Sequence, residues 1–195
     1  MSSNINSMYR ILKQDRIHQG DVLINLKFSN HYNSINENVT NYHVILSQDC
    51  DLDCVCNLLG KGVNSSPDLI NGNKYLPSIL FAPAFLTDNV HDGTYLSYLG
   101  FQMENKGKRT KTKWQDICKN NNLRYHFLDG CVEFDIPNLI IDFKIFYTLP
   151  FEFVNDEFDK CYGCSLNELF REDLSNRFFN YHSRIGLPEI NPLTP

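Results

Sequence analysis

The feature that most constrains the fold is the presence of apolar residues at alternate positions over 20–28. These residues are Val22, Ile24, Leu26 and Phe28. A period of two is typical of a β-strand with one buried face. A second apolar run, at 42–46, follows an Asn- and Ser-rich stretch over 29–41 that has no periodicity. We therefore predict that the two runs form the strands of a long first hairpin.

Later segments add to this sheet. Apolar runs at 123–128 and 139–144 predict two further strands, and residues 75–81 predict another that stops at Ala82-Pro83, because proline disrupts a central strand. Residues 84–99 and 112–119 each favour a short helix. Sheet is therefore expected to dominate as far as Pro150.

The clearest predicted helix covers 165–186. Ser165 and Glu168 have the spacing of a capping box, and an apolar and aromatic stripe follows. Gly186 is a helix-ending signal. The chain offers no other long amphipathic partner, so this helix is expected to pack on the sheet. The predicted class is mainly β (β-rich α+β), with about five to seven strands and a long C-terminal helix.

The chain length suits one domain. The 195 residues are 42% apolar and 13% aromatic, which is ample for a core and excludes a disordered chain. We expect a single domain over 1–195, with a flexible polar segment at 1–10 and a basic inserted loop at 104–114. The polar start lacks the apolar region of a secretory signal, and no apolar run reaches the roughly 20 residues of a membrane span. A cytoplasmic protein is expected.

A cluster of small and polar residues follows the second predicted strand. It includes Gln48, Asp49 and Asp51. At strand spacing the two carboxylates share a face, where they can position a nucleophile or bind a metal. Arg124, on a later predicted strand, can complete such a site. The alternative is structural: Asp49 caps a turn, Asp51 pairs with a nearby cation, and Arg124 forms an ordinary surface salt bridge.

Cysteine chemistry offers two further hypotheses. An odd count of seven cysteines in a chain without a secretory signal favours reduced thiols or a metal site over disulfides. Cys50 can act as a nucleophile if His43 or His126 is close enough to activate it; otherwise it is an inert small hydrophobe. Two close pairs can together form a tetrahedral structural zinc site: Cys54 and Cys56, with Cys161 and Cys164.

One segment is strongly basic in a chain whose net charge is −5. That net charge disfavours a protein that binds nucleic acid over its whole surface. The basic residues are Lys106, Lys108, Arg109, Lys111 and Lys113. They can attract a phosphate backbone or an acidic partner, with Trp114 available to stack on a base. The alternative is a solvated, mobile loop. No P-loop or dinucleotide-binding motif is present, so no nucleotide cofactor is expected.

Two stretches resemble the MazF/PemK-like superfamily of small SH3-like barrels, best known as toxin endoribonucleases. Residues 20–23 (Gly-Asp-Val-Leu) are similar to the family's opening strand, and residues 42–49 are similar to its second strand, which runs into a polar end. The order of later elements is also similar. Within the superfamily, the Ser-Gln-x-Cys-Asp-Leu motif at 47–52 and Gly-Leu-Pro at 186–188 resemble a larger branch.

This resemblance implies an SH3-like/PemK-like barrel with insertions and a component of a bacterial toxin–antitoxin or phage-defence system. The implied activity is a metal-independent endoribonuclease, in which the candidate catalytic residues are Gln48, Asp49, Asp51 and Arg124. The basic segment would hold RNA. The implied partners are RNA or a protein of the same system, and such barrels commonly form homodimers.

The sequence departs from the toxins at one point. They place a catalytic arginine in or beside the first hairpin loop, where it stabilises the negative charge that develops on the attacked phosphate. Residues 29–41 contain no Arg or Lys, which leaves His31 in the loop and Arg16 or Lys27 at its flanks. The departure favours an alternative: a non-catalytic adaptor that keeps the barrel and binds a protein partner.

Overall fold

The computed structural model describes residues 7–10, 15–28, 40–60, 72–108 and 111–183. Eight strands of these residues form one antiparallel sheet in the order β1-β8-β2-β3-β4-β6-β5, and β7 also pairs with β4. The strands are β1 (Tyr9–Arg10), β2 (Asp21–Ile24), β3 (Tyr42–Ile45), β4 (Ser78–Leu86), β5 (Tyr125–Leu128), β6 (Leu139–Asp142), β7 (Tyr147–Pro150) and β8 (Tyr162–Leu166). The α-helices are α1 (Asp49–Gly60), α2 (Thr87–Asp92), α3 (Lys111–Cys118), α4 (Phe151–Cys161) and α5 (Glu168–His182). Short 3₁₀ turns cover Gly72–Lys74, Ser97–Leu99, Lys106–Lys108 and Val132–Phe134.

The predicted first hairpin is confirmed. β2 and β3 pair antiparallel, with Val22 opposite Val44 and Leu23 opposite His43. The strands predicted at 123–128 and 139–144 are β5 and β6, which pair with each other. The short helices predicted within 84–99 and at 112–119 are α2 and α3.

The prediction that a strand ends at Ala82-Pro83 is wrong, because β4 continues through Pro83 to Leu86. On one side, β4 pairs with β7 up to Phe81 and with β6 only from Ala84 onward. Pro83 lies in the gap between these two partners, where its missing N–H removes no bond from either ladder.

The last helix begins later than the capping-box pattern predicts. Ser165 belongs to β8, and its hydroxyl donates to the carboxylate of Asp21 at 2.5 Å, so it does not cap the helix. The residue that precedes α5 is Asn167. Leu174 and Phe178 of α5 are buried against the sheet, as the pattern predicts, whereas Leu169 is 60% exposed. Residues 184–186 of the predicted helix lie outside the described residues.

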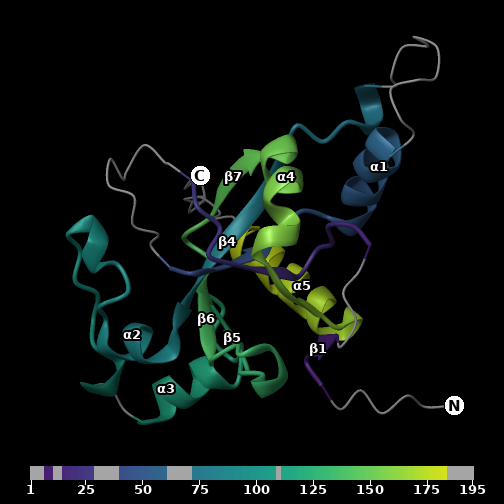
Figure 1. Cartoon of the computed structure of the whole chain (residues 1–195). Helices are drawn as coiled ribbons and strands as arrows, with labels where there is room; N and C mark the ends of the chain where they lie inside the picture. The colour runs from purple at the N-terminus through teal and green to yellow at the C-terminus, as the bar shows by residue number, and fades with distance from the viewer. Residues whose placement is uncertain (1–6, 11–14, 29–39, 61–71, 109–110, 184–195) are drawn as a thin grey trace, which may run out of the picture.

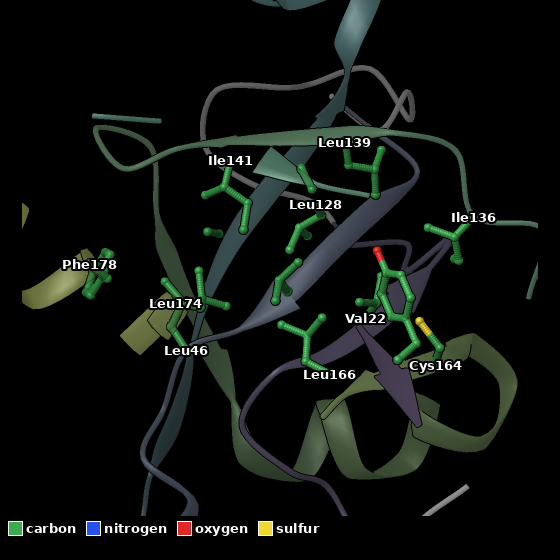
Figure 2. Close-up of a cluster of buried hydrophobic side chains, with 14 of the residues drawn as sticks. Val22, Leu46, Leu128, Ile136, Leu139, Ile141, Cys164, Leu166, Leu174 and Phe178 are labelled. Carbon is green, nitrogen blue, oxygen red and sulfur yellow. The ribbon is translucent and has the colours of Figure 1, made fainter. Parts of the chain in front are cut away.

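The sheet curls around one hydrophobic core. This core includes Tyr9 of β1 and Cys164 of β8 together with Leu128 of β5 and Leu139 of β6, so both ends of the strand order contribute to it. Figure 2 shows Leu128, Leu139 and Cys164 among the side chains that converge between the strands, with Leu174 and Phe178 of α5 at one side. A sheet whose two ends share a core is a half-barrel, and Figure 1 shows its strands surrounded by the helices.

Two further cores lie on the other face of the sheet, because neighbouring strand residues alternate between faces. Leu23 and Ile45 pack with residues of α1 and α4, whereas Val22 and Val44 face the first core. Ile140 of β6 packs with α2 and α3 in the third core. The chain is therefore a β-rich α+β protein with an antiparallel half-barrel sheet. No helix in the described part of the chain has the length and apolar character needed to span a bilayer.

The segment predicted to be flexible at 1–10 ends in β1, where Tyr9 is buried and pairs with Leu166. The helix α4 and the strands β7 and β8 have no counterpart in the sequence-based prediction.

Candidate functional site

The polar cluster after β3 lies at the start of a helix. The backbone carbonyl of Gln48 accepts hydrogen bonds from the amides of Asp51 and Leu52, and α1 begins at Asp49. Residues two apart on a helix point roughly 200° apart around its axis. The prediction that Asp49 and Asp51 share a face is therefore wrong, because they occupy a helical turn and not an extended strand end.

Asp49 is the centre of a charged cluster that we call the Asp49 cluster: Arg16, His18, Asp49 and Arg171. The Asp49 Oδ1 atom lies 2.9 Å from His18 Nδ1 and 3.7 Å from Arg171 Nη1, and Oδ2 accepts from Arg16 Nη2 at 3.1 Å. Oδ1 also accepts from the backbone N–H of Gln19. One carboxylate thus contacts three side chains that can carry positive charge.

The antiparallel β2–β3 pairing brings these residues together. It places the segment before β2 next to the segment after β3, and the Gly20 amide donates to the Ile45 carbonyl at 2.8 Å. Gly20 has φ 81°, and a Cβ at this position would lie 3.2 Å from Arg171 Cγ. A glycine here therefore permits both the left-handed turn and the close approach of α5.

The environment of the cluster favours the ionised form of Asp49 and the neutral form of His18. Partial burial favours the neutral form of Asp49, but the hydrogen bond and charge of Arg16, with His18 and Arg171, outweigh it and hold the Asp49 pKa below its usual value. Burial and the charge of Arg16 lower the pKa of His18, against the opposing effect of Asp49. At neutral pH the structure therefore pairs an ionised carboxylate with a neutral imidazole.

Asp21 is a second, buried carboxylate next to the cluster. Its side chain is fully buried and accepts from Ser165 Oγ at 2.5 Å and from the backbone N–H of His18 at 2.7 Å. Burial raises the Asp21 pKa to about 7, although both hydrogen bonds act in the opposite direction. Asp21 holds the turn that carries His18, and its own protonation changes near neutral pH.

The Asp49 cluster has the parts of a proton-transfer site. With His18 Nδ1 donating to Asp49, the lone pair lies on Nε2, and the carboxylate fixes both the tautomer and the orientation of the ring. His18 Nε2 is buried and has no hydrogen-bond partner in the described structure. Arg16 and Arg171 supply positive charge beside it. Such an arrangement can accept a proton next to a group that develops negative charge.

Other candidates of the motif remain outside the Asp49 cluster. Gln48, Cys50 and Asp51 are exposed, and Cys50 Sγ lies near Gln48 Oε1 and Asp51 Oδ1. The two histidines proposed to activate Cys50 are buried elsewhere: His43 lies within β3, and His126 lies within β5 beside Arg177. The nucleophile hypothesis for Cys50 therefore gains no support from this arrangement.

Arg124 lies at the far edge of the sheet, because β4 and β6 separate β3 from β5. Its guanidinium forms a bidentate pair with Asp142, with Nε–Oδ1 of 2.8 Å and Nη2–Oδ2 of 2.6 Å. The Asp142 side chain is fully buried. The structure therefore does not bring Arg124 to Asp49. Arg124 instead forms an ion pair with Asp142 that stabilises the fold.

The basic segment borders the third core. Lys106 starts a 3₁₀ turn and places its ammonium 5.6 Å from the centre of the Tyr125 ring, while Lys113 is exposed on α3. Trp114 is half-buried and packs edge-to-face on His91. Arg109 lies outside the described residues, as do the side chains of Lys108 and Lys111. The segment predicted to be a basic loop at 104–114 therefore includes, in its described part, the 3₁₀ turn Lys106–Lys108 and the start of α3.

The four cysteines of the zinc hypothesis are distributed over two faces of the sheet. Cys56 and Cys161 pack in the core beneath α1 and α4, whereas Cys164 belongs to the core enclosed by the sheet. Cys54 is half-buried on α1. Among the described residues, no three potential ligands form a group that could hold a metal ion.

Sequence reasoning missed His18 and Arg171 as site residues and considered Arg16 only as a flank of the hairpin loop. For His18 and Arg16, the signal in the sequence was their position before the first predicted strand. Once 20–28 and 42–46 are predicted to pair, polar residues before the first strand must lie beside those after the second. Arg171 had no such signal, because its approach depends on how α5 packs. No protein-family model matches the sequence, and no curated protein matches it.

Proposed function

We propose that the chain is a divergent MazF/PemK-like protein with an SH3-like barrel and a long C-terminal helix, and that it acts as a metal-independent endoribonuclease of a toxin–antitoxin or phage-defence system. The resemblance of residues 20–23 and 42–49 supports the family. The pairing of these two segments is compatible with it. The observation that carries the chemistry is the 2.9 Å contact between His18 Nδ1 and Asp49 Oδ1, beside two arginines.

In this proposal His18 is the general base. Its Nε2 takes the proton of a ribose 2′-hydroxyl, and the 2′-oxygen forms a bond to the adjacent phosphorus. The bond from phosphorus to the 5′-oxygen breaks, and that oxygen receives a proton from the imidazolium. The products are a 2′,3′-cyclic phosphate and a 5′-hydroxyl. This step consumes no water and requires no metal ion. Arg16 and Arg171 stabilise the negative charge on phosphorus-bound oxygens.

Arg16 would supply the positive charge that the toxins obtain from an arginine near the first hairpin loop, although Arg16 precedes β2 and lies at the other end of the hairpin from that loop. It approaches Asp49 from the segment before β2 and is 19% exposed. The basic residues around Lys106 and Lys113 would hold the RNA backbone at a distance from the reacting bond. Gln48, at the exposed end of the motif, would contact the RNA and take no part in proton transfer.

The test is cleavage of a mixed RNA ladder by the purified full chain, with and without EDTA. Replacing His18 by Ala should lower the rate by 10²- to 10⁴-fold, the typical contribution of a general base. Asp49→Asn should also lower it strongly. Asp51→Asn is the matched control, since Asp51 lies in the same helical turn but points away; its rate should stay within about threefold of wild type. Cleavage that EDTA abolishes would contradict the mechanism.

A non-catalytic adaptor is the second candidate, and one observation favours it. The charges of the Asp49 cluster are compensated once Asp53 is included, because Arg16 Nε also pairs with Asp53 Oδ1 at 3.2 Å, and the side chains of the cluster are only 11–30% exposed. Such a network can simply fix α5 against the first hairpin. The proposed chemistry requires RNA binding to expose His18 Nε2, whereas an adaptor requires no such step.

The two candidates differ in measurable ways. An adaptor predicts no cleavage by the wild type between pH 5 and 9, and a stoichiometric complex with one defined protein of the same system. His18→Ala would then leave complex formation unchanged. Binding of RNA without cleavage would instead indicate an RNA-binding protein that lacks the proposed catalysis.

A further inference from the structure

A second group of polar atoms without partners lies at His43, within the β2–β3 ladder. His43, in β3, is 1% exposed, and its ring contacts those of Phe28 and Tyr147. The ring centroids are 5.6 Å apart for Phe28 and His43 and 5.9 Å apart for His43 and Tyr147. Phe81 of β4 stacks behind Tyr147 at 6.1 Å. Figure 1 shows β7, which begins at Tyr147, alongside β4.

Two polar atoms of this aromatic group are buried and unsatisfied. Neither His43 Nδ1 nor Tyr147 Oη has a hydrogen-bond partner in the described structure. Buried polar groups are nearly always paired in folded proteins, because an unpaired one loses its bonds to water and gains nothing. Two such atoms on adjacent rings indicate a position that is completed by a molecule from outside the chain.

The electrostatics of the group restrict the chemistry of that molecule. Burial lowers the pKa of His43 to about 3, and no charged group of the described residues contributes to the shift. Burial likewise raises the pKa of Tyr147, with a smaller contribution from Tyr98. Both rings are therefore neutral at physiological pH. A phosphate, a carboxylate or an ammonium group would find no counterion here, so the molecule must be uncharged.

The surrounding surface favours a flat aromatic molecule. Phe28 and Tyr147 are each half-buried, with ring centroids 5.0 Å apart, whereas His43 beside them is buried. The Nδ1 of a neutral imidazole donates or accepts according to its tautomer, and a phenol can do either, so a molecule with a donor and an acceptor on one edge satisfies both atoms in either tautomer. The edge of a nucleobase carries a donor and an acceptor side by side, whereas Tyr, Trp and Phe side chains carry at most one polar atom.

We propose that Phe28, His43 and Tyr147 form a binding site for a neutral nucleobase. The base stacks on the rings of Phe28 and Tyr147, and its edge bonds to His43 Nδ1 and Tyr147 Oη. The Phe28 ring moves outward to admit it. The base belongs either to a free nucleoside or to a single-stranded RNA. This site does not depend on cleavage by His18, because His43 pairs with Leu23 within the β2–β3 ladder, whereas the Asp49 cluster lies beyond the end of that ladder where Gly20 meets Ile45.

The site can be tested by calorimetric titration of the full chain carrying His18→Ala, which removes the proposed cleavage. The probes are the four ribonucleosides and four six-nucleotide homopolymers with 2′-O-methyl groups. Tyr147→Phe removes one oxygen atom, and His43→Leu replaces the imidazole by an apolar side chain of similar volume. Tyr42→Phe is the matched control, because Tyr42 is the neighbour of His43 on β3 and packs against the opposite core.

We expect at least one nucleobase to bind and expect Tyr147→Phe and His43→Leu to weaken its binding tenfold or more. Tyr42→Phe should change it by less than twofold. The melting temperature of Tyr147→Phe should equal or exceed that of the parent, because the variant buries one unpaired oxygen fewer; a folding defect therefore cannot explain the loss. Binding of nucleosides identifies a free base as ligand, and binding of homopolymers alone identifies a base within RNA.

Two results would overturn this site: no binding of any probe at millimolar concentration, or binding that Tyr147→Phe and His43→Leu leave unchanged. Failure of the proposed ribonuclease function gives a different result. In that case the wild type cuts no RNA, yet the nucleobase still binds and the two substitutions still abolish its binding.

Discussion

The hydroxyl of Tyr9, in β1, donates a hydrogen bond of 2.6 Å to the backbone carbonyl of Asp129, directly after β5. These strands are the two ends of the sheet order. The bond therefore joins opposite edges of the half-barrel, between which the described part of the chain has no strand pairing, and it satisfies the hydroxyl of a tyrosine whose ring is buried in the core.

Removal of the Tyr9 hydroxyl should weaken the contact between the two edges of the sheet and destabilise the fold. We expect Tyr9→Phe to lower the free energy of unfolding by about 1–2 kcal/mol, because the Asp129 carbonyl loses its partner while the ring stays packed. Chemical denaturation measures the change. Tyr75→Phe is the control: Tyr75 is 40% exposed, and its hydroxyl contacts Glu152 on the surface, so its loss should cost less than about 0.5 kcal/mol. Equal effects of the two substitutions would mean that the Tyr9 bond adds nothing to the closure.

The first hairpin shows what periodicity can predict. Apolar residues at alternate positions over 20–28 and the run at 42–46 are sufficient to specify two strands, and the two strands pair antiparallel in the structure, as a hairpin requires. This pairing also determines that residues before β2 adjoin residues after β3. The contact between His18 and Asp49 is therefore a consequence of a pattern that is visible in the sequence.

Other parts could not be obtained in this way. After Leu46 the same residues suit an extended end or a helix start, and only the burial of Leu52 and Val55, three positions apart, identifies the helical period. Strand β8 contains Gly163 and Ser165, which weaken an apolar pattern. Its position between β1 and β2 is set by long-range pairing, and it explains why the apparent capping box at Ser165 misplaces the start of α5.

Gly20 couples the backbone of the hairpin to the Asp49 cluster. Both Gly20 and Gly100 have left-handed φ values, 81° and 77°, so an alanine at either position costs on the order of 1 kcal/mol in strain. A Cβ at Gly100 meets nothing within 4 Å, whereas at Gly20 it lies 3.2 Å from Arg171 Cγ and from Leu166 Cβ. Gly20→Ala should therefore destabilise the protein more than Gly100→Ala, measured by thermal unfolding.

The same two variants, Gly20→Ala and Gly100→Ala, separate the effect of backbone strain on stability from an effect on catalysis. If the Asp49 cluster acts in catalysis, Gly20→Ala should slow RNA cleavage by displacing Arg171, while Gly100→Ala should leave the rate of the folded protein unchanged. Equal rates for both variants would show that the position of Arg171 is unimportant to the reaction.

Asp21 should make stability depend on pH in a defined direction. Its pKa is 3.8 when unfolded and about 7 in the folded chain, so the folded state holds the extra proton between these values. A group with a raised folded pKa stabilises the fold fully below its unfolded pKa and loses this contribution as pH rises through the folded pKa. The shift corresponds to roughly 4 kcal/mol across the window from pH 4 to pH 8.

Comparison of wild type with Asp21→Asn isolates this effect. The lowered pKa of His18 acts in the opposite direction, since its contribution is lost as pH falls, but it is present in both proteins. The unfolding free energy of Asp21→Asn relative to wild type should therefore increase from pH 4 to pH 8, as measured by urea denaturation at each pH. A difference that is constant over this range would show that the Asp21 carboxyl keeps an ordinary pKa.

The pair of Arg124 and Asp142 should behave as a structural ion pair with unequal partners. Asp142 is fully buried and also accepts from Tyr95 Oη at 2.8 Å, whereas the Arg124 side chain is 24% exposed and reaches solvent. Arg124→Ala leaves a buried carboxylate without its cation, which typically costs about 3–5 kcal/mol. Asp142→Asn leaves a guanidinium that water can partly solvate, so we expect a smaller loss of stability, measured by urea denaturation.

The ion pair also tests where catalysis takes place. Because β4 and β6 separate Arg124 from the Asp49 cluster, the RNA cleavage rate of the folded Arg124→Ala protein should equal that of wild type when it is measured at a temperature where both are folded. Asp49→Asn provides the contrast, since it should lose activity under the same conditions. A selective loss of cleavage in Arg124→Ala, with stability unchanged, would move the reaction to the β5 edge of the sheet and away from His18.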